Sequence, residues 1–244
     1  LFQLPFLQRL HLLPRPRWDW SHPGVKRVLT LMLPAIFGVS VSQINLLLDT
    51  VLASLLPTGS VSWLYYSDRL VELPLGVIGI AIATVILPSL SRIPRAEQSH
   101  ETVAKFSETV AWAIRSVVAV ALPATAALIV LASPILYTLF QYQAMTASDV
   151  AMSSLSLRMY ALGLLAFMLI KVLATAYYSR QDMKTPVKIG IIAMVSNMFF
   201  NLILVFAYHY YWQVGHVGLA LATALSAFIN AGLLFRGLVR RGLL

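Results

Sequence analysis

Six long apolar runs alternate with short polar segments along the chain. The runs lie at about 29–56, 61–90, 108–131, 150–176, 187–208 and 217–239. Each run reaches the length of about 20 residues that an α-helix needs to cross the hydrocarbon core of a bilayer. Their apolar residues occupy all sides of such a helix rather than one stripe, which is typical of helices buried in lipid or in a bundle. The pattern therefore predicts an all-α, polytopic transmembrane helix bundle over residues 29–244.

Prolines and a threonine mark expected kinks and helix ends. The prolines inside or near the ends of the runs are Pro34, Pro74, Pro88 and Pro123. Proline lacks a backbone donor, so we expect kinks with freed carbonyl groups at these positions. Thr185 stands directly before Pro186. This pair predicts that Thr185 is the N-cap of the fifth helix, with proline at its first helical position.

The composition agrees with a membrane protein and excludes several classes. Hydrophobic residues make up 59% of the 244 residues and charged residues 11%, and the mean hydropathy is +0.80. Soluble domains carry about a quarter charged residues, so a soluble or disordered chain is excluded. The absence of cysteine excludes disulfides, Cys-ligated zinc and a thiol nucleophile. The chain begins at Leu1 without an initiator Met or a signal peptide, and we expect it to be a fragment.

Apart from Arg69, Arg158 and Lys171 inside the apolar runs, the basic residues gather in or beside alternate connecting segments. They are Arg9, Arg15, Arg17, Lys26 and Arg27 before the first run, Arg92, Arg95, Lys105 and Arg115 around the second loop, Arg180, Lys184 and Lys188 around the fourth, and Arg236, Arg240 and Arg241 in the tail. The other loops carry no Lys or Arg. The positive-inside rule then predicts that both ends of the chain are cytoplasmic. A net charge of +9 split in this way predicts no nucleic-acid partner.

The second run carries three charged residues within two turns. At about 100° per residue, Glu72 lies about 40° from Asp68, Arg69 about 100° and Ser62 about 120°, so all four share one face. The charges can neutralise one another as a structural cluster. Alternatively, ionisable residues at membrane depth mark a substrate or ion pathway, and the planar, permanently charged fork of Arg69 suits phosphate or carboxylate recognition.

A second group of polar residues is spread over three runs. Asp49 lies in the first run, Asn197 and Asn201 share one face of the fifth, and Thr223 lies in the sixth. Carboxylate, amide and hydroxyl oxygens together suit a hard cation such as sodium. The alternative is that Asn and Thr make hydrogen bonds between helices while Asp49 lies near the outer interface.

Motifs for common catalysis are absent from the sequence. It contains no GxxxxGK[ST], HExxH or GxSxG motif, so secondary transport without an enzyme activity is favoured. Two other classes stay open. One is a membrane enzyme that uses Asp68 and Glu72 as an acid/base pair. Carboxylates beside Arg69 are expected to stay ionised, however, which suits binding better than proton transfer. The other is a half-transporter that works with a partner chain.

Long, low-degeneracy strings in the chain resemble one known family. They are SVSWLYYSDRL at 60–70, FQY at 140–142 and YYSRQDMKTPVK at 177–188. These strings, and nearly the whole chain around them, resemble the MurJ (MviN) lipid II flippases of bacterial peptidoglycan synthesis. That family belongs to the superfamily of multidrug, oligosaccharidyl-lipid and polysaccharide exporters.

The resemblance implies a fold and a function for the whole protein. Such flippases have fourteen helices, arranged as two six-helix lobes and two C-terminal helices. Residues 1–28 would then be the end of the sixth helix and the cytoplasmic lobe connection, and 29–244 would be helices seven to twelve. The implied activity is translocation of lipid II across the bacterial inner membrane for cell wall biosynthesis, with lipid II, membrane lipids and the missing first lobe as partners. The alternative is a flippase for another polyprenyl-linked saccharide, or a cation-coupled drug exporter.

The resemblance also implies roles for both polar groups. Ser62, Asp68, Arg69 and Glu72 match family positions that line the central cavity. Arg69 would attract the pyrophosphate, and Asp68 and Glu72 would hold its orientation or exchange partners. Some family members hold sodium where Asp49, Asn197, Asn201 and Thr223 would lie, although Asn201 is neutral at a position where such members can carry an acid.

Overall fold

The computed structural model describes residues 8–9, 22–93, 100–142 and 145–244. All regular structure in these ranges is helical. The elements are α2 (Pro23–Ser54), α3 (Ser60–Pro74), the π-helix η1 (Leu75–Gly79), α4 (Ile80–Ser91), α5 (His100–Val130), α6 (Ala132–Phe140), α7 (Ala147–Ser179), α8 (Lys184–Trp212) and α9 (Gly215–Arg240). Most of the predicted connection over 1–28 lies outside the described residues.

Six helical segments are long and apolar enough to cross a membrane. They are Ile36–Ser54, Ser60–Ser91, His100–Val130, Ala147–Ser179, Lys184–Trp212 and Gly215–Arg240. Each overlaps one of the six apolar runs, so the all-α fold with six candidate spans is confirmed. The third span begins at His100 rather than near 108, because the Glu101–Lys105 ion pair and buried Phe106 extend the helix into the polar segment.

The second span is one continuous path of three helical elements. Pro74 ends α3 and lacks the N–H that a regular α-helix would use, and the five residues of η1 follow it directly. A π-turn inserted in an α-helix is frequent at functional sites. Here it follows immediately after the segment that carries Asp68, Arg69 and Glu72. The short helix α6 was not predicted, because nine residues are too few to form a span.

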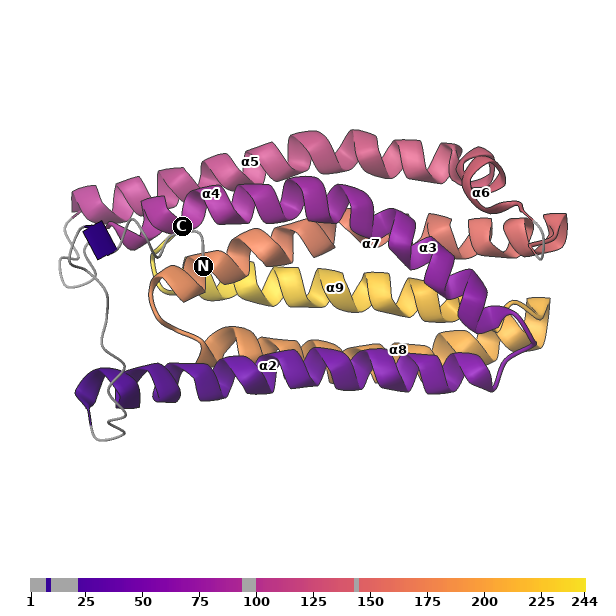
Figure 1. Ribbon diagram of the computed structural model, residues 1–244, viewed down its shortest axis with the longest axis horizontal. Helices are drawn as coiled ribbons and strands as arrows, with labels where there is room; N and C mark the ends of the chain where they lie inside the picture. The colour runs from indigo at the N-terminus through magenta and orange to yellow at the C-terminus, as the bar shows by residue number, and fades with distance from the viewer. Residues whose placement is uncertain (1–7, 10–21, 94–99, 143–144) are drawn as a thin grey trace. The chain divides into compact units, whose positions relative to one another are not determined.

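Contacts divide the chain into two units, 1–33 and 34–244. In the first unit, residues 23–33 form the opening turns of α2. In the second unit, α7 packs against α3, α4, α5, α6 and α9, and α8 packs against α9 (Figure 1). The helices α7 and α9 are more than half buried, unlike the other spans. The core of the bundle is therefore built around α7.

Glycines let the central helices approach one another closely. A Cβ atom on Gly163 of α7 would lie 2.9 Å from the Cα of Ala224 in α9. One on Gly218 of α9 would lie 2.7 Å from the carbonyl oxygen of Leu204 in α8. Small residues at helix crossings permit the close backbone packing that drives association of membrane helices. These two crossings hold α7, α9 and α8 in one row.

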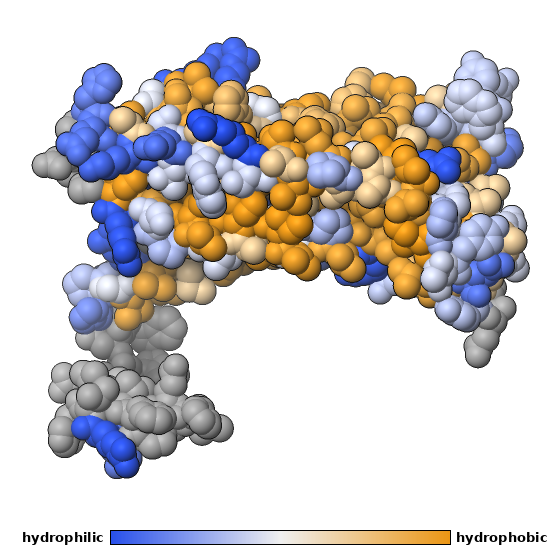
Figure 2. Space-filling model, turned by 90° about the horizontal axis from the view of Figure 1, so that it is seen from above, coloured by the Kyte–Doolittle hydropathy of each residue, from blue (hydrophilic) through white to orange (hydrophobic). Residues whose placement is uncertain are grey.

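The outer surface of the bundle is apolar over its middle part. Large hydrophobic side chains of α2, α4 and α8 are exposed, including Leu33, Phe199 and Phe206. Figure 2 shows these residue types as a broad hydrophobic band on one face, with hydrophilic residues gathered toward the two ends. Soluble monomers rarely expose apolar patches larger than a few hundred Å². The surface therefore matches a chain whose helices contact lipid or further transmembrane helices.

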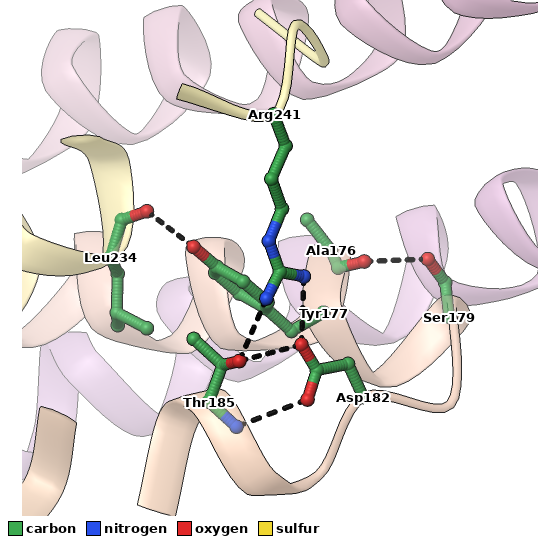
Figure 3. Close-up of polar contacts among 7 residues, drawn as sticks. All are labelled: Ala176, Tyr177, Ser179, Asp182, Thr185, Leu234 and Arg241. Carbon is green, nitrogen blue, oxygen red and sulfur yellow. Dashed lines mark hydrogen bonds and ion pairs between the residues drawn. The ribbon is translucent and has the colours of Figure 1, made fainter. Parts of the chain in front are cut away.

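A polar clamp ties together the ends of α7, α8 and α9 (Figure 3). The guanidinium of Arg241 donates to Asp182 Oδ2 at 2.7 Å and to Thr185 Oγ1 at 2.8 Å. It also lies over the ring of Tyr177, whose hydroxyl donates to the Leu234 carbonyl at 2.9 Å. We call Tyr177, Asp182, Thr185 and Arg241 the Asp182 clamp. It joins three helices through side chains outside the apolar band.

The clamp corrects the predicted start of the fifth span. Thr185 is not the N-cap: α8 begins at Lys184, and Met183 in the N-cap position makes no side-chain hydrogen bond. Asp182 instead accepts hydrogen bonds from the Thr185 backbone N–H at 3.0 Å and from its hydroxyl at 2.6 Å. A carboxylate satisfies a free N–H of the first turn and complements the positive end of the helix better than a hydroxyl does.

The clamp makes stability depend on the ionisation of Asp182. Partial burial raises the pKa of this carboxyl, but hydrogen bonds from Thr185 and the charge of Arg241 outweigh burial and lower it overall. Because the pKa of Asp182 is lower in the folded protein, its ionised carboxylate stabilises the fold. This stabilisation is complete above the pKa of the unfolded chain, about 3.9, and is lost as the pH falls through the pKa of the folded protein.

We expect Asp182→Asn to lower the free energy of unfolding by about 1 kcal/mol at neutral pH, since the ion pair with Arg241 is partly exposed.

Thermal unfolding of the purified protein in detergent, followed from pH 7 to pH 3, measures this effect. The difference between wild type and Asp182→Asn should shrink as the pH falls below 4. A difference that stays constant over this range would contradict a stabilising role for the ionised carboxylate.

Candidate functional site

The structure brings together the four residues predicted to share a cation. Asn201 Nδ2 donates to Asp49 Oδ1 at 2.6 Å and to Asn197 Oδ1 at 2.9 Å. Asn197 Nδ2 lies 3.4 Å from Thr223 Oγ1. Both asparagines are almost completely buried, whereas Asp49 and Thr223 are half-buried. One connected network therefore joins α2, α8 and α9, and we call it the amide network.

Asn45 belongs to the amide network and was missed by the sequence analysis. Its Nδ2 donates to Asp49 Oδ2 at 3.3 Å, so both carboxylate oxygens of Asp49 accept an amide hydrogen. The signal was present, because Asn45 and Asp49 are four residues apart and share a helix face. Asp49 therefore has two amide donors, Asn45 and Asn201.

Two oxygens of the amide network have no donor. Among the described residues, Asn45 Oδ1 and Asn201 Oδ1 are buried and make no hydrogen bond. A buried acceptor without a partner costs about 1–3 kcal/mol. Oxygen atoms from amides, a carboxylate and a hydroxyl are the ligands that hard cations prefer. The donor set and its unpaired oxygens therefore fit a small cation.

The second predicted group lies on α3, where Arg69 and Glu72 occupy an exposed side of the helix. Arg69 forms an ion pair with Glu72, one turn further along, and its guanidinium lies 4.9 Å from the centre of the Tyr65 ring. The side chains of Arg69 and Glu72 are both about half exposed. Ser62 is also exposed. We call Arg69, Glu72 and Tyr65 the arginine cluster.

Asp68 is separated from the arginine cluster, although it is adjacent in sequence. It is half-buried, and among the described residues it makes neither a hydrogen bond nor an ion pair. Of the two neighbouring carboxylates, Glu72 is therefore the one that pairs with Arg69 in the described part of the chain. At about 100° per residue, Asp68 lies on α3 between Ser67, which contacts α7, and Arg69.

Two hydrogen bonds between α3 and α7 explain why Arg69 is exposed. Buried Ser67 donates to the Ser153 carbonyl at 2.7 Å, and Trp63 Nε1 donates to Asp149 Oδ1 at 2.9 Å. The other carboxylate oxygen of Asp149 forms a capping box with Thr146 at the start of α7. With Trp63 and Ser67 against α7, helical geometry turns Arg69 toward the open side.

Both groups of described residues can bind charged partners. An exposed guanidinium with one carboxylate partner can exchange that partner for a phosphate or another carboxylate. The amide network can hold a cation. One helical unit therefore contains a site suited to anions, the arginine cluster, and a site suited to cations, the amide network.

The fold first defines a class. One solved structure, titled "Lipid II flippase MurJ, inward closed conformation", matches with a TM-score of 0.75 and 24% identity over 98% of this chain and 50% of that one. Another, an outward-facing multidrug resistance MATE family transporter of the MOP superfamily, matches with a TM-score of 0.57 and 19% identity over 88% of this chain and 45% of that one. The chain has the fold of a six-helix transporter lobe.

Sequence comparison then gives the family. The family model described as "Lipid II flippase MurJ" matches residues 1–244, and the chain belongs to this family. It is 57% identical to a probable lipid II flippase MurJ of Vibrio cholerae over 99% of this chain and 44% of the relative. It is 55% identical to one of Haemophilus influenzae over 98% of this chain and 46% of the relative. The chain thus spans less than half the length of these relatives.

Removing Asn201 should destabilise the fold, because its amide is the shared donor of the amide network. We expect Asn201→Leu to lower the free energy of unfolding by about 2 kcal/mol, since it leaves a carboxylate oxygen and an amide oxygen without a donor. Thermal unfolding in detergent measures this. Phe206→Leu, at a highly exposed position of the same helix, is the control and should change stability little. Equal stability of the two variants would contradict the role of Asn201.

Proposed function

We propose that this chain is the second lobe of a flippase that moves lipid II across the bacterial inner membrane by alternating access. The observation that carries this proposal is the family match over residues 1–244, together with 55–57% identity to relatives named probable lipid II flippases. The flippase performs no covalent chemistry. Residues 1–28 would connect this lobe to the first lobe, which supplies the opposite wall of the cavity.

Arg69 is the anion-binding residue of this lobe in the proposal. It lies at membrane depth, half exposed, on the side of α3 that faces away from α7. A pyrophosphate carries several negative oxygens, and a planar guanidinium binds such groups through two parallel hydrogen bonds. Glu72 holds Arg69 while the pyrophosphate is absent and releases it when the pyrophosphate arrives. An ion pair that exchanges one partner for another avoids an unpaired charge in the membrane.

The orientation of the lobe follows from its connecting segments. Within the described residues, the loops at 55–59 and 213–214 carry no Lys or Arg, whereas the Asp182 clamp end carries Arg180, Lys184 and Arg241. Positive residues remain on the cytoplasmic side. Both ends of this chain are therefore cytoplasmic in the proposal. The exposed Tyr210, Tyr211 and Trp212 at the end of α8 then lie at the periplasmic interface.

The amide network is the cation site in the proposal, with sodium as the ion. Asp49, Asn197, Asn201 and Thr223 supply its oxygens, and the unpaired oxygen of Asn45 adds a further ligand. A bound cation would neutralise Asp49. The buried oxygens of Asn45 and Asn201 that lack a donor support a cation site over hydrogen bonding between helices alone, because such bonding leaves these oxygens without a partner.

The alternative substrates are another polyprenyl-linked saccharide or a drug exported against a cation. The second solved structure is a multidrug transporter and shares the lobe fold. Its structural similarity is lower than that of the flippase structure. The two relatives at 55–57% identity are named for lipid II, and the proposal follows them.

Replacing Arg69 tests the anion-binding role. A strain depleted of its lipid II flippase is supplied with the complete flippase gene that contains the coding sequence of this chain, either as wild type or with Arg69→Ala. We expect growth with the wild type and at least about tenfold fewer colonies with the variant at equal membrane level, since one charge-assisted bidentate contact contributes about 1.5–3 kcal/mol.

Lys105→Ala provides a matched control. Lys105 also forms an exposed ion pair with a glutamate one turn away, but on α5. The Lys105→Ala variant should rescue growth as well as the wild type does. Rescue by Arg69→Ala would reduce the arginine cluster to a structural feature, and failure of the wild type would favour the alternative substrates.

Sodium should stabilise the protein through the amide network. A ligand that binds only the folded state at 100 times its Kd adds about 2.7 kcal/mol of stability. We therefore expect sodium to raise the Tm of the purified protein above its value in choline at equal ionic strength, and Asp49→Asn to remove this increase. Equal Tm values in sodium and choline for the wild type would contradict a sodium site.

A further inference from the structure

Lys171 is exposed, although it lies on α7, one of the two most buried spans. At about 100° per residue, Lys171 lies about five full turns after Ser153, and both residues therefore point to the same side of α7. Ser153 is completely buried there, and its carbonyl accepts a hydrogen bond from Ser67 of α3 at 2.7 Å. The second span thus covers this side of α7 at Ser153 but not at Lys171.

The second span moves around α7 between these two levels. Tyr160 and Tyr178 lie within about 20° of the same side of α7, and their exposed fractions rise from 9% to 41% toward the clamp end. A Cβ atom added to Gly79, the last residue of η1, would lie 3.3 Å from Met168 Cγ. Met168 points about 60° away from Lys171. The displacement coincides with η1, which interrupts the regular helix.

The helix α9 lies on the other flank of Lys171. Gly163 and Tyr177 contact α9. They point about 80° and 120° away from Lys171, in the opposite sense to Met168. Figure 1 shows the half of α7 that precedes α8 between α4 and α9, and both helices contact α7. Lys171 therefore lies in an opening between η1 and α4 on one side and α9 on the other, which we call the Lys171 opening.

The Lys171 opening contains a positive charge and no acid partner for it. Asp and Glu are absent from residues 150–181 along α7, from 80–91 of α4 and from 215–240 of α9. Among the described residues, the Lys171 ammonium forms no ion pair and no hydrogen bond. Asp182, the next acid along the chain, is already paired with Arg241 in the clamp. An unpaired ammonium inside a span is costly, and an anionic ligand would stabilise it.

The side chain of Lys171 starts toward the middle of the bundle. Cα–Cβ bonds in an α-helix tilt toward the N-terminus of the helix, and α7 begins at the end opposite to the Asp182 clamp. A lysine that only reaches for the nearest interface would have to turn its stem back toward the clamp end. The tilt therefore favours a ligand inside the Lys171 opening over a lipid headgroup at that interface.

Lys171 and Arg69 are too far apart to bind one pyrophosphate together. The Ser67–Ser153 hydrogen bond joins α3 and α7, which run in the same direction. Measured along the helices from this bond, Arg69 lies about 3 Å and Lys171 about 27 Å toward the clamp end. A pyrophosphate is much shorter than the distance between them. The two cations can therefore serve only as successive sites.

We propose that Lys171 binds the pyrophosphate of a polyprenyl pyrophosphate lipid at the cytoplasmic end of the lobe, before the pyrophosphate reaches Arg69. This inference rests on the proposed function and adds a second anion-binding residue to it. In the proposed orientation the clamp end is cytoplasmic, so a substrate that leaves the cytoplasmic leaflet meets Lys171 first. An ammonium binds phosphate as a point charge, whereas a guanidinium binds it through a planar fork. Lys171 therefore accepts the pyrophosphate in varied orientations, and Arg69 fixes one of them.

The first experiment measures Kd for undecaprenyl pyrophosphate with the complete purified flippase in detergent. All variants carry Arg69→Ala, so that binding at Lys171 is measured alone. We expect residual binding in this background, about tenfold weaker binding with Lys171→Gln and recovery with Lys171→Arg, since one charge-assisted hydrogen bond contributes about that factor. Phosphatidylglycerol in excess should not displace the pyrophosphate lipid. Lys188→Gln, at an exposed lysine of α8 near the same end, is the matched control and should leave Kd unchanged.

A second experiment tests whether residue 171 faces a water-filled opening. Lys171→Cys, in a complete flippase without other cysteines, is treated in inverted membrane vesicles with a thiol reagent that cannot membranes cross unaided. Leu169→Cys is the control at the same depth, because Leu169 lies about 160° around α7 from Lys171. We expect modification of Lys171→Cys only, and about fivefold slower modification when undecaprenyl pyrophosphate is present at several times its Kd.

The outcomes separate this inference from the proposed function. The role of Lys171 is overturned, with the Arg69 site left in place, by a complete loss of binding in Arg69→Ala or by an unchanged Kd with Lys171→Gln. Equal competition by phosphatidylglycerol also overturns it, because Lys171 would then bind any lipid headgroup. Modification of Leu169→Cys as fast as Lys171→Cys overturns the opening itself. A wild-type flippase that does not bind undecaprenyl pyrophosphate overturns the proposed function instead.

Discussion

The rotation of α3 against α7 is the constraint on which the rest of the arrangement depends. Ser67 and Trp63 donate to groups on α7, and the second of these bonds ends on the carboxylate that also caps α7. Away from water, such bonds are kept, because breaking them leaves buried polar groups unpaired. They place Arg69 and Glu72 on the side of α3 that faces away from α7. A helix of the same sequence turned by a third of a revolution would bury the guanidinium instead.

Polar groups in this lobe are concentrated at three levels along the bundle. The Asp182 clamp joins α7, α8 and α9 beyond the apolar band. The amide network joins α2, α8 and α9. The Trp63–Asp149 pair joins the first turns of α3 and α7. Each level connects helices that are separated in sequence. The amide network contains two buried amide oxygens without a donor in the described part of the chain, Asn45 Oδ1 and Asn201 Oδ1. The clamp is saturated with hydrogen bonds and therefore suits a fixed structural role.

Packing between α7 and α9 gives this lobe a rigid centre, while α2 and α3 carry the charged residues at its edge. The Gly163–Ala224 crossing is too close for any larger side chain at either position. The π-turn after Pro74 lies one turn beyond Glu72 and interrupts the regular hydrogen bonding of the second span. In the proposed alternating-access cycle, a helix interrupted there can bend while α7 and α9 keep their contacts. The arginine cluster lies directly before that interruption in the chain.

The sequence by itself determined the number, order and approximate limits of the spans, because apolar runs of membrane length have few other stable forms. It also identified Asp49, Asn197, Asn201 and Thr223 as one oxygen set, and Arg69 as an arginine at membrane depth. Tertiary structure decided which of these residues meet. Asn45 joins the set, Asp68 separates from Arg69, and Asp182 replaces Thr185 at the start of α8. The physical reason is that periodicity fixes the angle of a residue around its own helix, whereas its partner depends on how far each helix is rotated against its neighbours. Close glycine crossings and single interhelical hydrogen bonds set that rotation.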